Sequence, residues 1–166
     1  MPRRRQINFA GFLACTGLMG YALYAQYGLG LEPCPLCIFQ RIGVILMGVA
    51  FLAAALHHPR GGGRYAYGAL IVVFALLTAA VAIRQLYIQS LPPGTLPSCG
   101  APLAMLLKFM PVIEVVRRVL SGSGECGEIN WTVLGLAMPA WVLMSVGLLG
   151  AGAAIANFRR EASAAR

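Results

Sequence analysis

Four long runs of apolar residues constrain this chain most, because each can cross the hydrocarbon core of a membrane as one helix. A helix rises about 1.5 Å per residue, so roughly 20 apolar residues span a core of about 30 Å. The runs cover approximately residues 9–27, 38–56, 65–83 and 131–155, and an extension of the third to Gln89 is compatible with the sequence. We therefore predict an all-α integral membrane protein, in which residues 1–166 form a single domain built as a bundle of four transmembrane helices.

The composition excludes an ordinary soluble domain. Charged residues make up 11% of the chain and apolar residues 59%, whereas a soluble domain carries about 25% charged residues. The formal net charge of +8 does not indicate a nucleic-acid partner, because the basic residues form short clusters between the apolar runs. A nucleic-acid-binding face would gather them on one surface among aromatic residues. Membrane lipid is the expected surrounding of this chain.

The basic clusters also predict the orientation of the helices, because Lys and Arg are concentrated in cytoplasmic loops. Eight basic residues lie at the two termini and in the loop at 57–64: Arg3, Arg4, Arg5, Arg60, Arg64, Arg159, Arg160 and Arg166. The basic residues of the loops at 28–37 and 90–130 are Lys108, Arg117 and Arg118. We expect both termini in the cytoplasm and these two loops on the other side. The first run is interpreted as a retained helix, because its removal as a signal peptide would place the termini on opposite faces.

The loop at 90–130 is the only long one in the predicted topology, and it contains a predicted amphipathic helix at 111–120. At 100° per residue its apolar side chains share one arc, whereas Glu114, Arg117 and Arg118 share the opposite arc. The apolar arc consists of Val112, Ile113, Val116, Val119 and Leu120. We expect this short helix to lie in the lipid headgroup region. Packing on the ends of the other helices is the alternative.

The positions of the five cysteines are the strongest functional signal in the sequence. Cys15 lies inside the first apolar run, where a thiol is expected to act as a small packing residue. The other four lie in the two outward loops, two in each: Cys34 and Cys37, then Cys99 and Cys126. Disulfides persist outside the cytoplasm, so these four cysteines are the candidate redox residues.

Cys34 and Cys37 form a C-x-x-C motif at the expected start of the second helix. The positive end of a helix dipole stabilises a thiolate there, which makes a disulfide exchangeable, and Cys37 is the better placed of the two. Arg41 lies one turn deeper on the same helical face and would add a cation beside that thiolate. The alternative is an Arg41 side chain that extends to the interface and pairs with Glu32.

The loop pair Cys99 and Cys126 leaves two interpretations open. An inert disulfide would stabilise a long loop by about 3–4 kcal/mol. A second exchangeable pair beside the C-x-x-C motif would instead form a relay that a soluble dithiol protein attacks. A metal site is not expected, because the loop cysteines are far apart and the only histidines, His57 and His58, lie at the other end of the second helix.

The chain resembles the disulfide bond formation protein B (DsbB) family over nearly its whole length. The resemblance rests on the C-P-L-C sequence at 34–37 followed by Arg41, on Cys99 and Cys126, and on the L-A-M-P-A-W sequence at 136–141. It implies a bacterial inner-membrane oxidoreductase with periplasmic redox loops, which supports protein disulfide bond formation. Such an enzyme reoxidises a periplasmic DsbA-like thiol oxidase of the thioredoxin fold and passes two electrons to quinone, either ubiquinone or menaquinone.

By position, the resemblance implies a role for each candidate residue. Cys99 would form the mixed disulfide with the DsbA-like partner, and Cys34 would either resolve it or exchange with the loop pair. Cys37 would face quinone as the thiolate, and Arg41 would hold the quinone headgroup. Some members of the family carry a His near the outer end of the third span, where this chain has Gln89. Gln89 is therefore a candidate quinone contact through its side-chain amide.

Two other functions are compatible with the residues. The vitamin K epoxide reductase family also joins a membrane C-x-x-C motif to loop cysteines and quinone, but there the loop pair precedes the motif in the chain. A non-enzymatic metal-handling membrane protein is the alternative from a different class. Quinone retained in the purified protein would favour an enzyme, whereas stoichiometric zinc or copper would favour the metal-handling protein.

Overall fold

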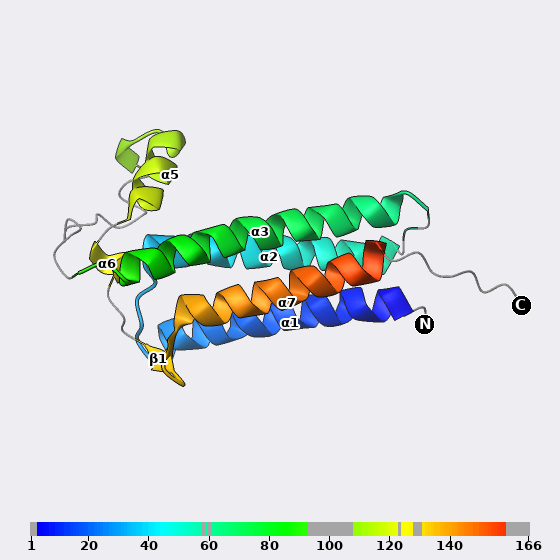
Figure 1. Ribbon diagram of the computed structural model, residues 1–166, viewed down its shortest axis with the longest axis horizontal. Coiled ribbons are helices and arrows are strands. Elements are labelled where there is room, and N and C mark those ends of the chain that lie inside the picture. Colours follow the sequence, from blue (N-terminus) through cyan, green and yellow to red (C-terminus); the bar gives the residue numbers. More distant parts are fainter. Residues whose placement is uncertain are drawn as a thin grey trace, which may run out of the picture.

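The computed structural model describes residues 3–57, 59, 61–92, 108–122, 124–127 and 131–158. Within these residues, four long helices form the body of the molecule: α1 (Arg3–Tyr27), α2 (Pro35–His57), α3 (Gly63–Gln89) and α7 (Met138–Phe158). They lie side by side along one axis and alternate in direction (Figure 1). All four are long and apolar enough to cross a membrane. The prediction of an all-α membrane bundle is confirmed.

The core of the bundle is apolar, and all four helices contribute to it. Its buried residues include Cys15 of α1, Met47 and Phe51 of α2, Ile71 of α3 and Val146 of α7. Cys15 lies in this cluster, as expected of a packing residue. A Cβ atom added at Gly150 of α7 would lie 2.9 Å from the Ala75 Cβ of α3. Small residues at such crossings let helices pack closely inside a membrane.

The outward faces of the four helices carry large apolar side chains. Leu13, Val49, Leu76 and Leu148, one from each helix, are between 53% and 76% exposed. A helix that is apolar on all sides must be surrounded by apolar material. These faces are therefore those of helices in contact with lipid.

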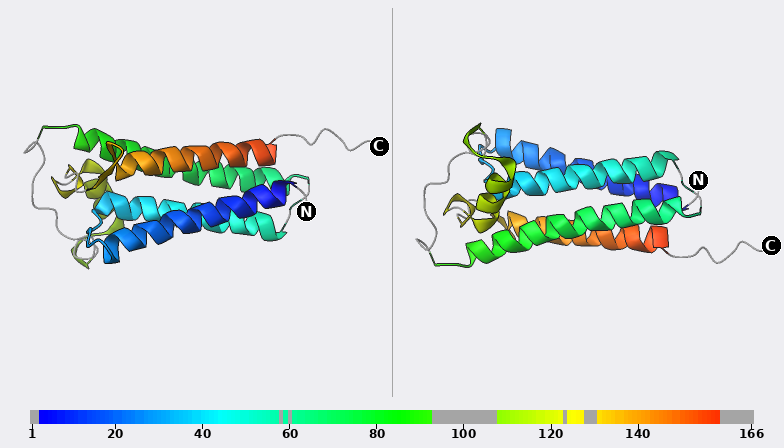
Figure 2. Two further views of the ribbon diagram at one scale, coloured as in Figure 1. Left: turned by 90° about the horizontal axis from the view of Figure 1, so that it is seen from below. Right: turned by 90° about the horizontal axis from the view of Figure 1, so that it is seen from above.

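The bundle has a terminal end and a loop end. The N-terminal end of α1 and the C-terminal end of α7 lie together at the terminal end, where α2 also turns into α3 (Figure 2). In that turn Gly61 has a φ of 67°, a left-handed conformation that glycine adopts without steric cost. The other end, here called the loop end, holds the connection between α1 and α2.

The fourth long helix begins later than the sequence predicts. The apolar run predicts a start near Trp131, whereas α7 begins at Met138. Two short antiparallel strands precede it, β1 (Thr132–Val133) and β2 (Leu136–Ala137). The turn residues Leu134 and Gly135 have φ values of 53° and 78°, and positive φ at both positions is what a two-residue type I′ turn requires. A hairpin therefore replaces the predicted first turns of the helix.

The described part of the long loop contains two further helices at the loop end, α5 (Val112–Ser121) and α6 (Gly124–Gly127) (Figure 1). α5 corresponds to the predicted amphipathic helix, but its apolar residues face two ways. Val115 and Val119 are buried in a cluster with Leu36 of α2. Val112 and Ile113 are 66% and 78% exposed. One edge of α5 thus packs on the bundle, and placement of the other edge in the headgroup region stays a prediction.

Candidate redox site

The C-x-x-C motif lies where the loop from α1 enters α2. The helix begins at Pro35, which suits the first helical position because it has a fixed φ and no N–H to satisfy. Cys34 precedes the helix, and its Sγ accepts a hydrogen bond of 3.4 Å from the backbone N–H of Cys37. The Cys34 thiol donates to the Cys37 Sγ, 3.0 Å away. The first turn of α2 therefore holds the two sulfur atoms against each other.

The short helix α6 brings a third cysteine to this motif. Cys126 is 1% exposed and packs in a cluster with Leu36 and Ile88. Its side chain is in hydrogen-bond contact with Cys34. This contact, the hydrogen bond to Cys37 and burial together raise the pKa of the Cys34 thiol well above its usual range. The loop before α2 and the helix α6 of the long loop therefore meet at Cys34, where these contacts favour the thiol over the thiolate.

The fourth candidate cysteine, Cys99, lies outside the described residues. Its pairing with Cys126 and its role toward a partner stay predictions from the sequence. The described geometry brings together the other three cysteines, with Cys34 in contact with both Cys37 and Cys126.

Two glutamines that the sequence analysis did not single out lie directly beside the motif. Gln85 of α3 donates through Nε2 to Cys34 Sγ at 3.4 Å and to Cys37 Sγ at 3.3 Å. Gln40 of α2 donates through Nε2 to the Oε1 atom of Gln85 at 2.7 Å. The signal that identifies them in the sequence is a polar residue inside an apolar span, which is a candidate functional residue by default.

Arg41 is held by α1. Its guanidinium donates to the side-chain oxygen of Gln26 and, at 3.1 Å, to the backbone oxygen of Ala22. Its partners within the described residues are thus on the first helix, rather than Glu32 as the alternative from the sequence proposed. Two partners on one neighbouring helix hold the planar guanidinium in a defined orientation.

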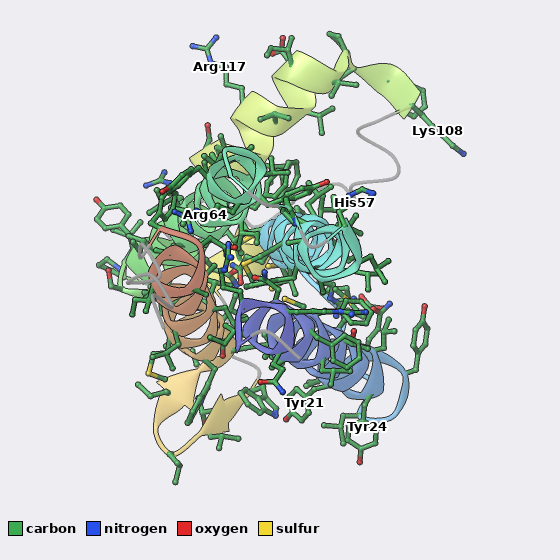
Figure 3. All side chains as sticks on the ribbon, turned by 90° about the vertical axis from the view of Figure 1, so that its right-hand side faces the viewer. Tyr21, Tyr24, His57, Arg64, Lys108 and Arg117 are labelled. Atoms are coloured by element: carbon green, nitrogen blue, oxygen red, sulfur yellow. The ribbon has the colours of Figure 1, made fainter. Side chains whose placement is uncertain are left out.

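A pocket of about 170 Å³ lies beside the motif and is lined by residues of α1, α2, α3, α7, the hairpin and the loop before α2. Its polar lining comes from Glu32, Cys34, Cys37, Gln40, Arg41, Gln85 and Gln89, and apolar and aromatic side chains, including Trp131 and Trp141, form most of the remainder. The Oε1 atom of Gln89 is buried and has no hydrogen-bond partner among the described residues. The basic side chains of Lys108 and Arg117 point away from the bundle (Figure 3). Among the described residues that line the pocket, Arg41 is the only Lys or Arg.

These features define a class of protein. Four membrane-spanning helices contribute to the lining of the pocket, a pair of thiols lies at the start of one helix, and a cysteine from a distant loop contacts one member of that pair. This is the arrangement of a membrane thiol–disulfide oxidoreductase.

Comparison with known proteins identifies the family. The family described as Disulfide bond formation protein DsbB matches residues 4–156, and the chain belongs to it. A protein named Disulfide bond formation protein B from Hahella chejuensis is 50% identical over 141 residues, which cover 85% of this chain and 86% of the relative. The protein of that name from Xanthomonas campestris (strain 8004) is 49% identical over 152 residues, 91% of this chain and 88% of the relative. The one from Methylococcus capsulatus is 44% identical over 153 residues, 92% of each.

The family membership confirms the resemblance seen in the sequence. The protein is a multi-pass membrane oxidoreductase of disulfide bond formation. The geometry described above brings three of the candidate redox cysteines, Cys34, Cys37 and Cys126, together at the loop end of the bundle.

Proposed function

We propose that this protein reoxidises a periplasmic DsbA-like thiol oxidase and passes the two electrons to membrane quinone, which sustains protein disulfide bond formation. The observation that carries the proposal is the position of Cys34. It contacts Cys126 of the long loop and Cys37 of α2, and both members of the motif line the pocket. The contacts of Cys34 thus connect Cys126 in the long loop to Cys37 at the pocket.

In the proposed sequence, electrons enter from the dithiol of a soluble partner of the thioredoxin fold. A partner thiolate attacks a Cys99–Cys126 disulfide at Cys99, and the second partner thiol then displaces Cys99. The partner leaves as a disulfide, and Cys99 and Cys126 are left as thiols. Two electrons and two protons have moved from the partner to the loop pair.

The loop pair next exchanges with a Cys34–Cys37 disulfide. Cys126 attacks Cys34, with which it is in contact, and Cys37 leaves as a thiolate. Cys99 then attacks Cys126, which re-forms the loop disulfide and releases Cys34 as a thiol. As many S–S bonds form as break, and the two electrons now lie on the motif beside the pocket.

The residues of the pocket fit a quinone headgroup, with a mostly apolar wall and a few polar groups. The Arg41 guanidinium is placed to donate to a ring oxygen. The buried Gln89 oxygen has no partner among the described residues, and an amide offers both an acceptor and a donor. Such a group suits a ring oxygen that is a carbonyl before reduction and a hydroxyl after it. A bound ubiquinone or menaquinone supplies the two-electron acceptor for the thiols of the motif.

The proposed location is the bacterial cell inner membrane, with both termini in the cytoplasm and the loop end in the periplasm. Two observations support this orientation. The ends of α1 and α7 lie together at the terminal end (Figure 2), and the excess of Lys and Arg belongs to that side of the chain. The cysteines of the loop end would then lie where disulfides persist.

The test is anaerobic mixing of the purified protein with a reduced DsbA-type oxidase and a soluble quinone analogue, followed by the quinone absorbance. The wild-type protein should reduce one quinone for each partner dithiol oxidised. Replacing Cys34, Cys37, Cys99 or Cys126 by Ser should abolish turnover, because the relay needs every sulfur. The matched control is Cys15→Ser, a change in the core of the bundle, which should keep nearly full turnover.

Three results would contradict parts of this account. Absence of quinone reduction by the wild-type protein would overturn the proposed function. A folded but inactive Cys15→Ser variant would contradict the assignment of Cys15 to packing. Stoichiometric zinc or copper in the preparation, without quinone reduction, would support a metal-handling protein instead.

A further inference from the structure

We propose that Gln85 and Gln40 form an amide pair that keeps a hydrogen-bond donor fixed against the sulfur atoms of the C-x-x-C motif and thereby sets the reactivity of Cys37. Gln85 touches the reacting sulfurs and is a catalytic residue. Gln40 acts through Gln85 and is a positioning residue. The inference rests on the proposed function, in which Cys34 and Cys37 alternate between dithiol and disulfide.

The contacts of the pair are direct. The Gln85 Nε2 atom lies 3.4 Å from Cys34 Sγ and 3.3 Å from Cys37 Sγ, so one NH₂ group serves both sulfurs. The Gln85 Oε1 atom is 2.7 Å from Gln40 Nε2 and 3.7 Å from Cys37 Sγ. Gln85 and Gln40 are 3% and 4% exposed. Water is therefore largely excluded as a competing partner for either amide.

The contact with Gln40 decides which end of the Gln85 amide faces the sulfurs. A glutamine amide has a donor end and an acceptor end of similar size, so its partners determine the orientation. Gln40 donates to the Gln85 oxygen, which leaves the NH₂ group for the sulfurs. Without Gln40, the oxygen of Gln85 would turn toward the sulfurs in part of the molecules, and an oxygen repels a thiolate.

A donor at this place favours the thiolate, which is the reactive form of cysteine. A hydrogen bond to a charged acceptor is strengthened where water is excluded. An amide supplies the donor without a buried charge of its own, which a Lys or Arg at position 85 would add at a large desolvation cost. Losing one hydrogen bond to a charged group corresponds to a change on the order of tenfold to a hundredfold in the thiolate equilibrium.

Other charged and titratable groups surround the motif, and the test leaves most of them unchanged. Arg41 and Glu32 line the same pocket, and Cys34 and Cys126 adjoin each other. The measurement uses the full-length chain with Cys99→Ser and Cys126→Ser, reduced and without partner or quinone. The one thiol that remains outside the motif is Cys15, which is buried in the core of the bundle and is distinguished by mass spectrometry. Arg41 and Glu32 are the same in every variant compared.

The experiment measures the rate at which iodoacetamide alkylates Cys37 as a function of pH, read by mass spectrometry. Gln85→Met removes the donor but keeps the length of the side chain. It should slow alkylation at neutral pH by roughly tenfold to a hundredfold and move the midpoint of the profile to higher pH. Gln40→Met should move the midpoint in the same direction by less. The double variant should match Gln85→Met, because Gln40 acts only through Gln85.

The matched control is Thr78→Val. Thr78 is a buried polar residue of α3 whose hydroxyl bonds to the backbone oxygen of Phe74, and it lies two helical turns from Gln85 on the same face. A general loosening of the contact between α2 and α3 would change this variant as well. The alkylation profile of Thr78→Val should coincide with that of the unsubstituted background.

An unchanged profile in a folded Gln85→Met protein would overturn the proposal, even if its melting temperature fell. Additive shifts in the double variant would remove Gln40 from the positioning role. If Gln85→Met did not fold, Gln40→Met alone would decide, because it leaves every group in contact with the sulfurs in place. Failure of the wild-type protein to reduce quinone would overturn the proposed function. The alkylation measurement uses neither quinone nor partner, so the two failures can be told apart.

Discussion

At the residue scale, several polar side chains inside the bundle have hydrogen-bond partners on neighbouring helices. Asn8 of α1 and Asn157 of α7 donate to each other at 3.5 Å and 3.2 Å near the terminal end. The Gln40 contact with α3 and the Arg41 contacts with α1 do the same near the loop end. Lipid offers no partner to a polar group, so each of these contacts fixes how two helices face each other.

The proposed role of Arg41 in quinone binding leads to the first prediction. Arg41→Lys keeps the charge but loses the planar fork that reaches both Gln26 and the backbone of Ala22. The apparent KM for quinone should rise in Arg41→Lys and rise further in Arg41→Met. A lost hydrogen bond to a charged group costs about 1.5–3 kcal/mol, which corresponds to roughly tenfold to a hundredfold in affinity.

Stopped-flow measurement of the two half-reactions provides the control for this prediction. The proposed exchange between the partner dithiol and the loop pair does not involve quinone, so Arg41→Met should leave its rate nearly unchanged. If quinone reduction were also unchanged in Arg41→Met, the residue would serve only to join α2 to α1.

Cys34, Cys37 and Arg41 can be singled out from the sequence because their relation is local: a C-x-x-C spacing and one helical turn. Cys15 was assigned to packing from its place in an apolar run, and its burial in the core agrees. Gln85 was missed for the opposite reason. Its contacts with Cys34 and Cys37 join residues 51 and 48 positions apart, and no spacing in the chain predicts which residue of α3 faces the start of α2.

At the scale of single elements, Arg84 attaches the loop helix α5 to α3. Its Nε and Nη2 atoms donate to the backbone oxygens of Leu120 and Ser121 at 2.9 Å and 3.2 Å. These carbonyl groups belong to the last turn of α5, where no further helical N–H is available to bond them. A cation at this end also interacts favourably with the helix dipole. Cys126 follows only a few residues later, so the attachment of α5 helps to place it against Cys34.

We therefore predict that Arg84→Met weakens the docking of α5 by about 1 kcal/mol. The measurement is the rate of oxidative formation of the Cys34–Cys126 disulfide in a Cys37→Ser, Cys99→Ser background, which should fall about fivefold. Arg117→Met is the matched control, because Arg117 lies on α5 and points away from the bundle (Figure 3). Equal rates in the two variants would show that Arg84 does not position Cys126.

The hairpin before α7 shows where prediction of elements from the sequence fails. Residues 131–155 contain no charge and read as one apolar run, which by itself is compatible with a single helix. The interruption depends on Leu134, whose φ is 53°, a conformation that is uncommon for a leucine. The tertiary setting supports it, because Trp141 of α7 donates to the backbone oxygen of Val133 at 3.2 Å.

At the scale of the whole molecule, the two ends of the bundle differ in the residues they carry. The thiols and the pocket belong to the loop end, and the terminal end holds the excess of basic residues. We predict that a periplasm-active reporter fused after Arg166 is inactive and that the same reporter inserted in the loop at 90–130 is active. An active fusion after Arg166 would reverse the proposed topology.

The last prediction concerns the assembly with the soluble partner. A Cys126→Ser variant cannot form the loop disulfide, so Cys99 remains a free thiol. The Cys99 thiolate should then attack the disulfide of an oxidised DsbA-type partner, which breaks that disulfide and leaves a mixed disulfide between Cys99 and the partner. No second loop thiol is present to displace the partner, and the complex should accumulate. Mass spectrometry of the trapped species should find the partner on Cys99.

The control for this prediction is the Cys99→Ser/Cys126→Ser variant, which should trap far less of the partner. Recovery of the partner on Cys34 in Cys126→Ser would mean that electrons enter at the motif and not at the loop.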